Sequence, residues 1–105
     1  QHIDPSWVPL IGTPPFPEYT SGHSVQSGAT NAVLVALFGD GPFLDETHAA
    51  RGLAPRQFDS LTQAFEEAAI SRLYGGIHYP IGIDEGVPQG RCVGQAVVDG
   101  VKTRK

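Results

Sequence analysis

The sequence is poor in cysteine, methionine and basic residues. Cys92 is the one cysteine of the chain, which excludes an internal disulfide and any metal site built from several cysteines. Lys and Arg number 7 against 11 Asp and Glu, and the resulting net charge of -4 excludes a general attraction to nucleic acid or to an anionic membrane. An anion site in this chain must therefore be built by local geometry.

Long apolar runs are also missing. No stretch approaches the roughly eighteen apolar residues of a membrane span, and residues 1–9 lack the basic and then apolar layout of a signal peptide. We therefore expect a soluble chain without a membrane span. Because the sequence opens without Met in a proline-rich polar stretch, we also expect the natural start of the protein to lie upstream of Gln1.

The rest of the composition is typical of one globular domain. The chain has 105 residues, of which 40% are hydrophobic, and this is enough for one modest core. Its 13 glycines and 9 prolines indicate long irregular connections. We predict an all-α fold in which residues 1–105 form a single domain of three main helices joined by long ordered loops.

Apolar residues at helical spacing give the bounds of the expected helices. These are residues 22–38, 59–74 and 84–102. Ser60 followed by Gln63 has the form of a capping box at the start of the second helix, and Asp84 is a plausible N-cap of the third. Gly28, on the flank of the first helix, suggests a close approach to another helix.

The connections are expected to be ordered. Residues 1–21 hold five prolines with apolar residues between them, which predicts an extended strap that packs on the helices. Residues 39–58 are expected to form a loop with a short extended pair around Phe43-Leu44 and Gln57-Phe58.

Two short polar stretches hold groups that helix packing does not require. In the first, Ser21 can donate a hydroxyl hydrogen bond and Gly22 lets the backbone approach a ligand closely. The free N–H groups at the start of the helix point toward any anion bound there. His23 is then held beside that anion, where an imidazole can give or take a proton near neutral pH.

The second stretch crosses the end of the second helix. Arg72 offers a planar fork of donors that matches a tetrahedral oxyanion. The turn at Gly75-Gly76 can bring His78 back toward the same place. One small anion could therefore meet Ser21, Gly22, Arg72 and both histidines.

Each of these residues also has a purely structural interpretation. Ser21 before a helix is by default an N-cap, and Arg72 in a last helical turn is usually a solvated charge that the helix dipole favours. Glu66 and Glu67 are most simply the solvent-facing side of the second helix. The combination of the two stretches, rather than any single residue, favours a functional site.

That combination resembles a known superfamily. Residues 16–24 resemble the Pro-Ser-Gly-His signature of the vanadium-dependent haloperoxidase and type-2 phosphatidic acid phosphatase superfamily, with Thr20 where Pro is commonest. Residues 71–78 are similar to its pattern of Ser-Arg, five residues and His. The runs Trp7-Val-Pro-Leu and Gly75-Gly-Ile-His-Tyr-Pro look like the bacterial haloperoxidase-like branch. The resemblance implies a C-terminal portion of the superfamily's helical bundle.

The resemblance also implies a role for each residue. His78 would bond the central atom of the anion, as the ligand of vanadate in a haloperoxidase or as the nucleophile that forms phosphohistidine in a phosphatase. His23 would be the general acid or base. Arg72, the Ser21 hydroxyl and the Gly22 N–H would neutralise the equatorial oxygens. Vanadate is the implied cofactor in the first case, and no cofactor is implied in the second.

The sequence departs from the superfamily pattern in two places. The first motif, a Lys followed by six residues and Arg-Pro, is not in this chain. The commonest pattern also has an Asp four residues after the second His, where this chain has Gly82. Asp84 lies two residues further on, and whether it can orient His78 instead is left open.

Three functions follow as alternatives. The chain could be the vanadate-binding part of an enzyme that oxidises halide with hydrogen peroxide. It could belong to a phosphomonoesterase that acts on a phosphate ester, with phosphate in the same site. It could also be a catalytically silent fragment that lacks two of the three cations, and a homo-oligomer could then cover its open helix faces. The resemblance implies a bacterial protein, and a periplasmic or secreted location is open.

Overall fold

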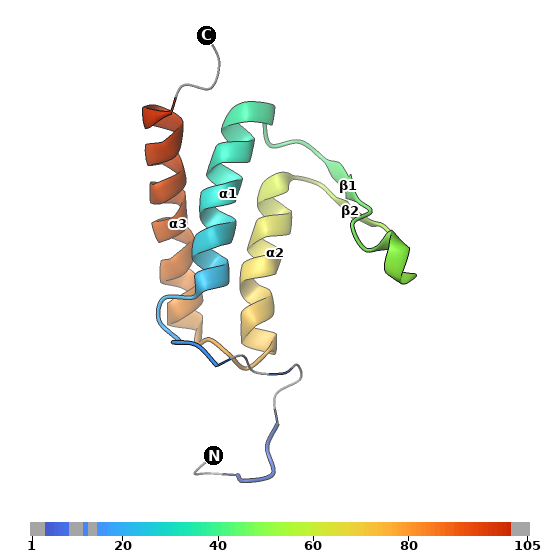
Figure 1. Ribbon diagram of the computed structural model, residues 1–105, viewed down its shortest axis with the longest axis vertical. Coiled ribbons are helices and arrows are strands. Elements are labelled where there is room, and N and C mark those ends of the chain that lie inside the picture. The colour runs from blue at the N-terminus through green and yellow to red at the C-terminus, as the bar shows by residue number, and fades with distance from the viewer. Residues whose placement is uncertain (1–3, 9–11, 13–14, 102–105) are drawn as a thin grey trace.

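The computed structural model describes residues 4–8, 12 and 15–101 of the chain. Three helices lie side by side in Figure 1, with α1 (Gly22–Phe38) between α2 (Leu61–Tyr74) and α3 (Pro80–Gly100). The prediction of a helical fold with three main helices is confirmed, and the bounds of the first two agree closely with the expected ones.

The connection between α1 and α2 carries a small antiparallel sheet of two strands, β1 (Phe43–Asp45) and β2 (Arg56–Phe58). Phe43 pairs with Phe58, and their rings stack with centroids 5.3 Å apart. The predicted extended pair is therefore present. A short 3₁₀ helix (Ala49–Arg51) between the strands was not predicted.

Glycines allow α1 and α3 to pack closely. A Cβ atom at Gly28 would lie 2.5 Å from the Val87 carbonyl oxygen, and one at Gly94 would lie 2.5 Å from the Ala29 carbonyl oxygen. No side chain fits at such distances, so the two backbones can meet only because these positions are glycine. The expected close contact at Gly28 is confirmed.

Side-chain hydrogen bonds fix the start of α2. The Ser60 Oγ accepts a hydrogen bond from the Gln63 N–H at 3.0 Å, and the Gln63 Oε1 accepts one from the Asp59 N–H at 2.8 Å. The capping-box prediction is therefore confirmed, with the returning bond made one residue before the N-cap. Asn31 of α1 donates to the Thr62 Oγ1 at 3.1 Å and ties the two helices together at this end.

The predicted start of the third helix at Asp84 is wrong. The helix begins four residues earlier, at Pro80, and Tyr79 is its N-cap. Proline is well suited to a first helical position, because its ring presets φ and its missing N–H would have no helical acceptor there. Asp84 is an exposed residue of the second turn, so the capping role assigned to it is also wrong. At the other end α3 stops at Gly100, two residues before the expected bound.

The expected strap packs on the helices mainly at its C-terminal end. Glu18 and Thr20 bond to Tyr79 and Gln89 respectively. Earlier in the strap Val8 is 75% exposed and Trp7 is 52% exposed. Other apolar residues of the strap, Leu10 and Ile11, lie outside the described residues.

The buried core of the described residues is small. Its hydrophobic members are Phe58, Ala69, Ile77 and Ile83. Large apolar side chains stay exposed along all three helices, and Phe38 of α1 is 73% exposed. Across the part of the chain that the structure describes, no helix is long and apolar enough to cross a membrane.

Candidate functional site

Ser21 closes the first turn of α1. It is fully buried, its Oγ accepts a hydrogen bond from the Ser24 N–H at 3.3 Å, and its own N–H donates to the Gly82 carbonyl at 2.9 Å. The interpretation of Ser21 as an N-cap is confirmed. A hydroxyl oxygen that accepts one hydrogen bond still carries its own proton to donate. Ser21 therefore fixes the start of α1 in contact with α3 and keeps one donor.

The backbone that follows Ser21 is open to solvent. Gly22 and His23 are exposed, and no heavy atom outside the neighbouring residues lies within 4 Å of where a Gly22 Cβ would be. N–H groups in the first turn of a helix have no acceptor within the helix. The start of α1 thus offers backbone donors and the positive end of a helix dipole to an anion.

The electrostatics of His23 connect this turn to the end of α2. Partial burial of the ring is the largest cause that lowers the pKa of His23, followed by the electrostatic effects of Arg72 and of the neighbouring His78. The interaction between charges weakens with distance, so charged groups shift a pKa only when they lie near the titrating group. The fold therefore brings His23, Arg72 and His78, which are distant in the sequence, within electrostatic reach of one another.

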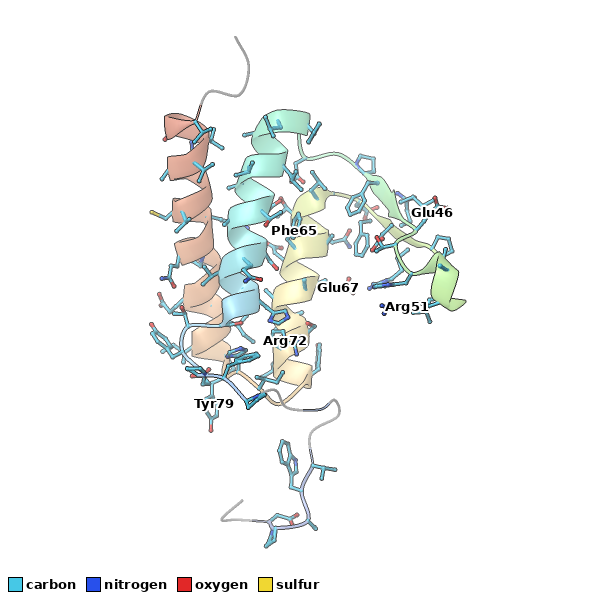
Figure 2. The ribbon with its side chains drawn as sticks, viewed as in Figure 1. Glu46, Arg51, Phe65, Glu67, Arg72 and Tyr79 are labelled. Carbon is cyan, nitrogen blue, oxygen red and sulfur yellow. The ribbon has the colours of Figure 1, made fainter. Side chains whose placement is uncertain are left out.

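The turn after α2 reverses the chain and places His78. The Ile77 N–H donates to the Arg72 carbonyl at 3.2 Å, and the Gly76 N–H donates to the Leu73 carbonyl at 2.9 Å. This pair of bonds, with Gly76 at a φ of 62°, is a Schellman motif. Figure 2 shows Arg72 near the end of α2, at the same end of the helices as Tyr79. The glycine turn therefore brings His78 back to the end of α2, as the sequence suggested.

His78 is enclosed by the strap and the turn. The residue is 4% exposed, and its ring stacks on that of Phe16 with centroids 6.0 Å apart. The His78 Nδ1 lies 3.6 Å from the Glu18 Oε1. Together with Trp7 and residues of the turn, His78 lines a cavity of about 440 Å³.

Buried polar atoms without partners mark the site. Within the described residues, four buried side-chain atoms lack a hydrogen-bond partner: Ser24 Oγ, Arg72 Nε, His78 Nδ1 and His78 Nε2. Each such atom costs about 1–3 kcal/mol in a folded protein unless a ligand or water satisfies it. The Ser24 side chain packs against Gly86 of α3, and the other three atoms belong to Arg72 and His78. A tetrahedral oxyanion would accept from Arg72, and a neutral imidazole nitrogen would offer its lone pair to the central atom. The residues present therefore fit vanadate or phosphate.

Sequence reasoning assigned no role to Phe16 or Glu18, which both contact His78. Phe16 covers the face of the ring, and Glu18 approaches its Nδ1. Both residues lie in the stretch quoted for the family resemblance, but spacing along the chain could not show that they reach His78. Asp84, considered above as an orienting group, is exposed.

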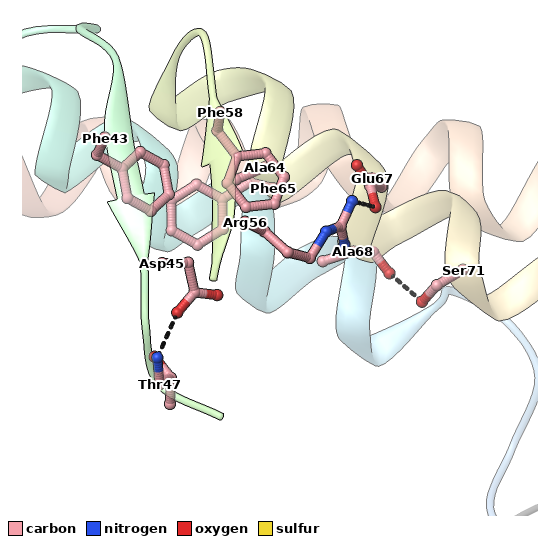
Figure 3. Close-up of a pocket in the computed structure, with 10 residues that line it drawn as sticks. All are labelled: Phe43, Asp45, Thr47, Arg56, Phe58, Ala64, Phe65, Glu67, Ala68 and Ser71. Carbon is pink, nitrogen blue, oxygen red and sulfur yellow. Dashed lines mark hydrogen bonds and ion pairs between the residues drawn. The ribbon is translucent and has the colours of Figure 1, made fainter. Parts of the chain in front are cut away.

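A second cavity of about 440 Å³ lies elsewhere, between the two-stranded sheet and α2 (Figure 3). Arg56 lies over the Phe58 ring at 4.9 Å from its centroid and pairs with Glu67 at 2.6 Å. The Glu66 carboxylate pairs with Arg91 of α3 at 2.9 Å. The side chains of Glu66 and Glu67 are 57% and 44% exposed, in keeping with the expected solvent-facing side of α2, but both join α2 to other elements. None of the five predicted site residues lines this cavity.

Comparisons with known proteins agree with the helical fold. A family model described as the VCPO second helical-bundle domain matches residues 1–104. Among solved structures, the crystal structure of a bacterial vanadium-dependent iodoperoxidase is similar, with 57% sequence identity and a TM-score of 0.90 over 96% of this chain. The chain covers 25% of the length of that structure. A comparison with curated protein sequences finds no match.

Proposed function

The chain belongs to the family of VCPO second helical-bundle domains of vanadium haloperoxidases, and on this premise we propose that it forms the vanadate-binding part of an enzyme that oxidises halide with hydrogen peroxide. The observation that carries the proposal is the buried, unpartnered Arg72 Nε and His78 nitrogens near the start of α1. Iodide is the first halide to consider, because the similar solved structure is that of an iodoperoxidase.

Each residue of the proposed site has a distinct task. His78 would hold vanadate through a neutral ring nitrogen, because only an unprotonated nitrogen has a lone pair to bond with. Arg72 and the Gly22 N–H would donate to its oxygens and balance their negative charge. Bound vanadate would supply a Lewis-acidic centre that activates peroxide toward halide.

His23 would handle protons at this site. The lowered pKa of its imidazole favours the neutral form near pH 7, so the ring can accept a proton from an incoming acid such as hydrogen peroxide. Ser21 would act mainly by holding the first turn of α1 in place, because its hydroxyl is buried and caps that turn.

The remaining cations of the superfamily pattern would come from other parts of the full-length protein. Arg72 is the one cation of the family motifs in this chain, and the first motif would add a Lys and an Arg. Charge-assisted contacts contribute about 1.5–3 kcal/mol each, so the 105-residue chain alone should bind vanadate much more weakly than the full-length protein.

The test is iodide oxidation by the full-length protein with vanadate and hydrogen peroxide. Replacing His78 with Ala should abolish turnover, because it removes the imidazole nitrogen that would bond the central atom. His48→Ala is the matched control, since His48 is an exposed histidine before the short 3₁₀ helix and should leave activity intact. Activity that survives in the His78→Ala variant would contradict the proposal. Hydrolysis of a phosphate ester without halide oxidation would assign the site to a phosphatase.

A further inference from the structure

We propose that Glu18 is the positioning residue of His78. Its carboxylate faces the Nδ1 side of the imidazole and so directs Nε2 toward the oxyanion. This inference rests on the proposed function, and it gives a role to a residue that the signature motifs do not include. Four observations in the structure carry it.

The first two observations are the contacts of the Glu18 carboxylate. Its Oε1 accepts a hydrogen bond from the Tyr79 N–H at 2.9 Å and lies 3.6 Å from the His78 Nδ1. The Tyr79 bond fixes the carboxylate next to the residue that it would orient. The His78 side chain is 0% exposed, so bulk solvent does not screen its attraction to Glu18.

The third observation concerns the neighbouring glycine. A Cβ atom at Gly82 would lie 2.5 Å from the Glu18 Oε1. The carboxylate of Glu18 therefore occupies the space into which a side chain at position 82 would project. The commonest superfamily pattern has an Asp at this position, and here a carboxylate from the strap fills the same space.

The fourth observation is how firmly the strap is held there. The Ser21 N–H donates to the Gly82 carbonyl at 2.9 Å, and the Thr20 Oγ1 donates to the Gln89 Oε1 at 2.7 Å. These bonds clamp the residues after Glu18 onto the first turns of α3. The bonds of Glu18, Thr20 and Ser21 to α3 and its N-cap thus hold Glu18 in position relative to His78.

The contact with His78 has a defined chemical consequence. A carboxylate beside Nδ1 favours the tautomer with a proton on Nδ1, which leaves the lone pair on Nε2. At 3.6 Å the two atoms are farther apart than in a hydrogen bond, and their attraction is electrostatic. A bond from Nε2 to an electrophilic centre makes the Nδ1 proton more acidic, and catalytic hydrogen bonds commonly shorten when the reactant complex forms. Glu18 would then stabilise the ligated imidazole.

The experiment compares four variants of the full-length protein: Glu18→Gln, Glu18→Ala, Gly82→Asp and the double variant Glu18→Ala with Gly82→Asp. Two quantities are measured. The first is the dissociation constant of orthovanadate, by isothermal titration calorimetry. The second is the pair of ring ¹⁵N chemical shifts of His78 without vanadate, which report the tautomer directly.

Glu18→Ala should weaken vanadate binding about 10- to 100-fold, as is typical when an outer partner of a ligating histidine is lost. The His78 shifts should move away from the Nδ1-protonated tautomer. The double variant should recover most of the affinity, because its new carboxylate enters the vacated space. Gly82→Asp alone should weaken binding, because two carboxylates would then compete for one space.

Glu18→Gln separates positioning from a structural role. The amide oxygen can still accept from the Tyr79 N–H, so the urea midpoint of unfolding should stay near that of the unmodified protein, while vanadate affinity falls. Unchanged affinity and unchanged His78 shifts in Glu18→Gln would overturn the proposal. If the unmodified protein binds no vanadate, the proposed function fails, but the His78 shifts still decide whether Glu18 sets the tautomer.

Discussion

His23 is the residue whose protonation the fold controls most visibly. Burial of the ring and the electrostatic effects of Arg72 and His78 lower the pKa of His23 below its ordinary value of 6.5. The folded state therefore prefers the neutral imidazole more strongly than the unfolded state does. By linkage, the stabilisation is fully present above pH 6.5 and is lost as the pH falls from 6.5 through the lowered folded pKa.

We therefore predict a specific pH dependence of stability. Between pH 8 and pH 5 the urea midpoint of unfolding should fall further for the unmodified protein than for a His23→Gln variant, since the variant has no imidazole to protonate at this position. The difference between the two curves gives the contribution of His23 to the pH dependence of stability, separate from that of the other histidines. Parallel curves would mean that the environment of His23 does not disfavour its charge.

Ser21 gives a second prediction at the residue scale. Replacing Ser21 with Ala removes the side-chain acceptor of the Ser24 N–H and should lower the free energy of unfolding by about 0.5–2 kcal/mol, the usual effect of losing an N-cap. Vanadate affinity should fall as well, because the first turn of α1 would fray. Urea denaturation and calorimetry measure the two effects, and a loss of affinity without a loss of stability would instead assign the hydroxyl a direct contact with the anion.

At the scale of elements, the packing of α1 on α3 determines where the first turn of α1 lies. A Cβ at Gly90 would collide with the Val25 carbonyl oxygen and lie 2.9 Å from the Ala29 N. Because backbone atoms cannot move aside as a flexible side chain can, the two helices would have to separate.

Gly90→Ala should therefore destabilise the protein by about 1–3 kcal/mol, the usual effect of overpacking. Gly100→Ala is the matched control: it adds the same methyl group to the same helix, where no heavy atom lies within 4 Å. Its effect should stay within about 0.5 kcal/mol, as for other surface substitutions. Equal effects of the two substitutions on the urea midpoint would contradict the close approach of α1 and α3.

The elements also show how far sequence reasoning could go. Local signals were sufficient for α1 and α2, since apolar periodicity and the Ser60 capping box need only neighbouring residues. The start of α3 was misplaced because two local signals competed, and Pro80 at a first helical position prevailed over Asp84 as a cap. The contact of Glu18 with the turn before α3 joins residues 61 apart in the sequence, so no local pattern could reveal it.

The candidate site was predictable to a similar extent. Its residues were predicted from two short motifs. Ser21, Gly22 and His23 stand at the start of one helix, and Arg72 and His78 flank the end of another. Their mutual approach depends on helix packing. That packing could be expected only from the family resemblance, because no single motif contains the contact.

At the scale of the whole molecule, many large apolar side chains of the described residues are exposed. Large side chains such as Phe38 at 73% and Ile81 at 62% exposure face solvent, while the buried hydrophobic core of the described residues is small. The chain also covers 25% of the length of the similar iodoperoxidase structure. We infer that other parts of the full-length protein cover these helix faces.

The 105-residue chain in isolation should therefore self-associate or bind a hydrophobic dye such as ANS. Sedimentation velocity over a range of concentrations measures the association, and dye fluorescence measures the exposed surface. A concentration-independent monomer that unfolds cooperatively and binds no dye would contradict this prediction.

The central claim is that the start of α1 and the end of α2, with the turn that follows it, face one anion site. The most direct test is an NMR pH titration of the His23 ring in the folded protein and in two variants, Arg72→Gln and His78→Ala. Arg72→Gln removes a positive charge that lowers the pKa of His23, and His78→Ala removes the neighbouring imidazole, which also lowers it, so that pKa should rise toward its ordinary value in each, and more in Arg72→Gln. A His23 pKa that neither substitution changes would show that the three side chains do not share a site.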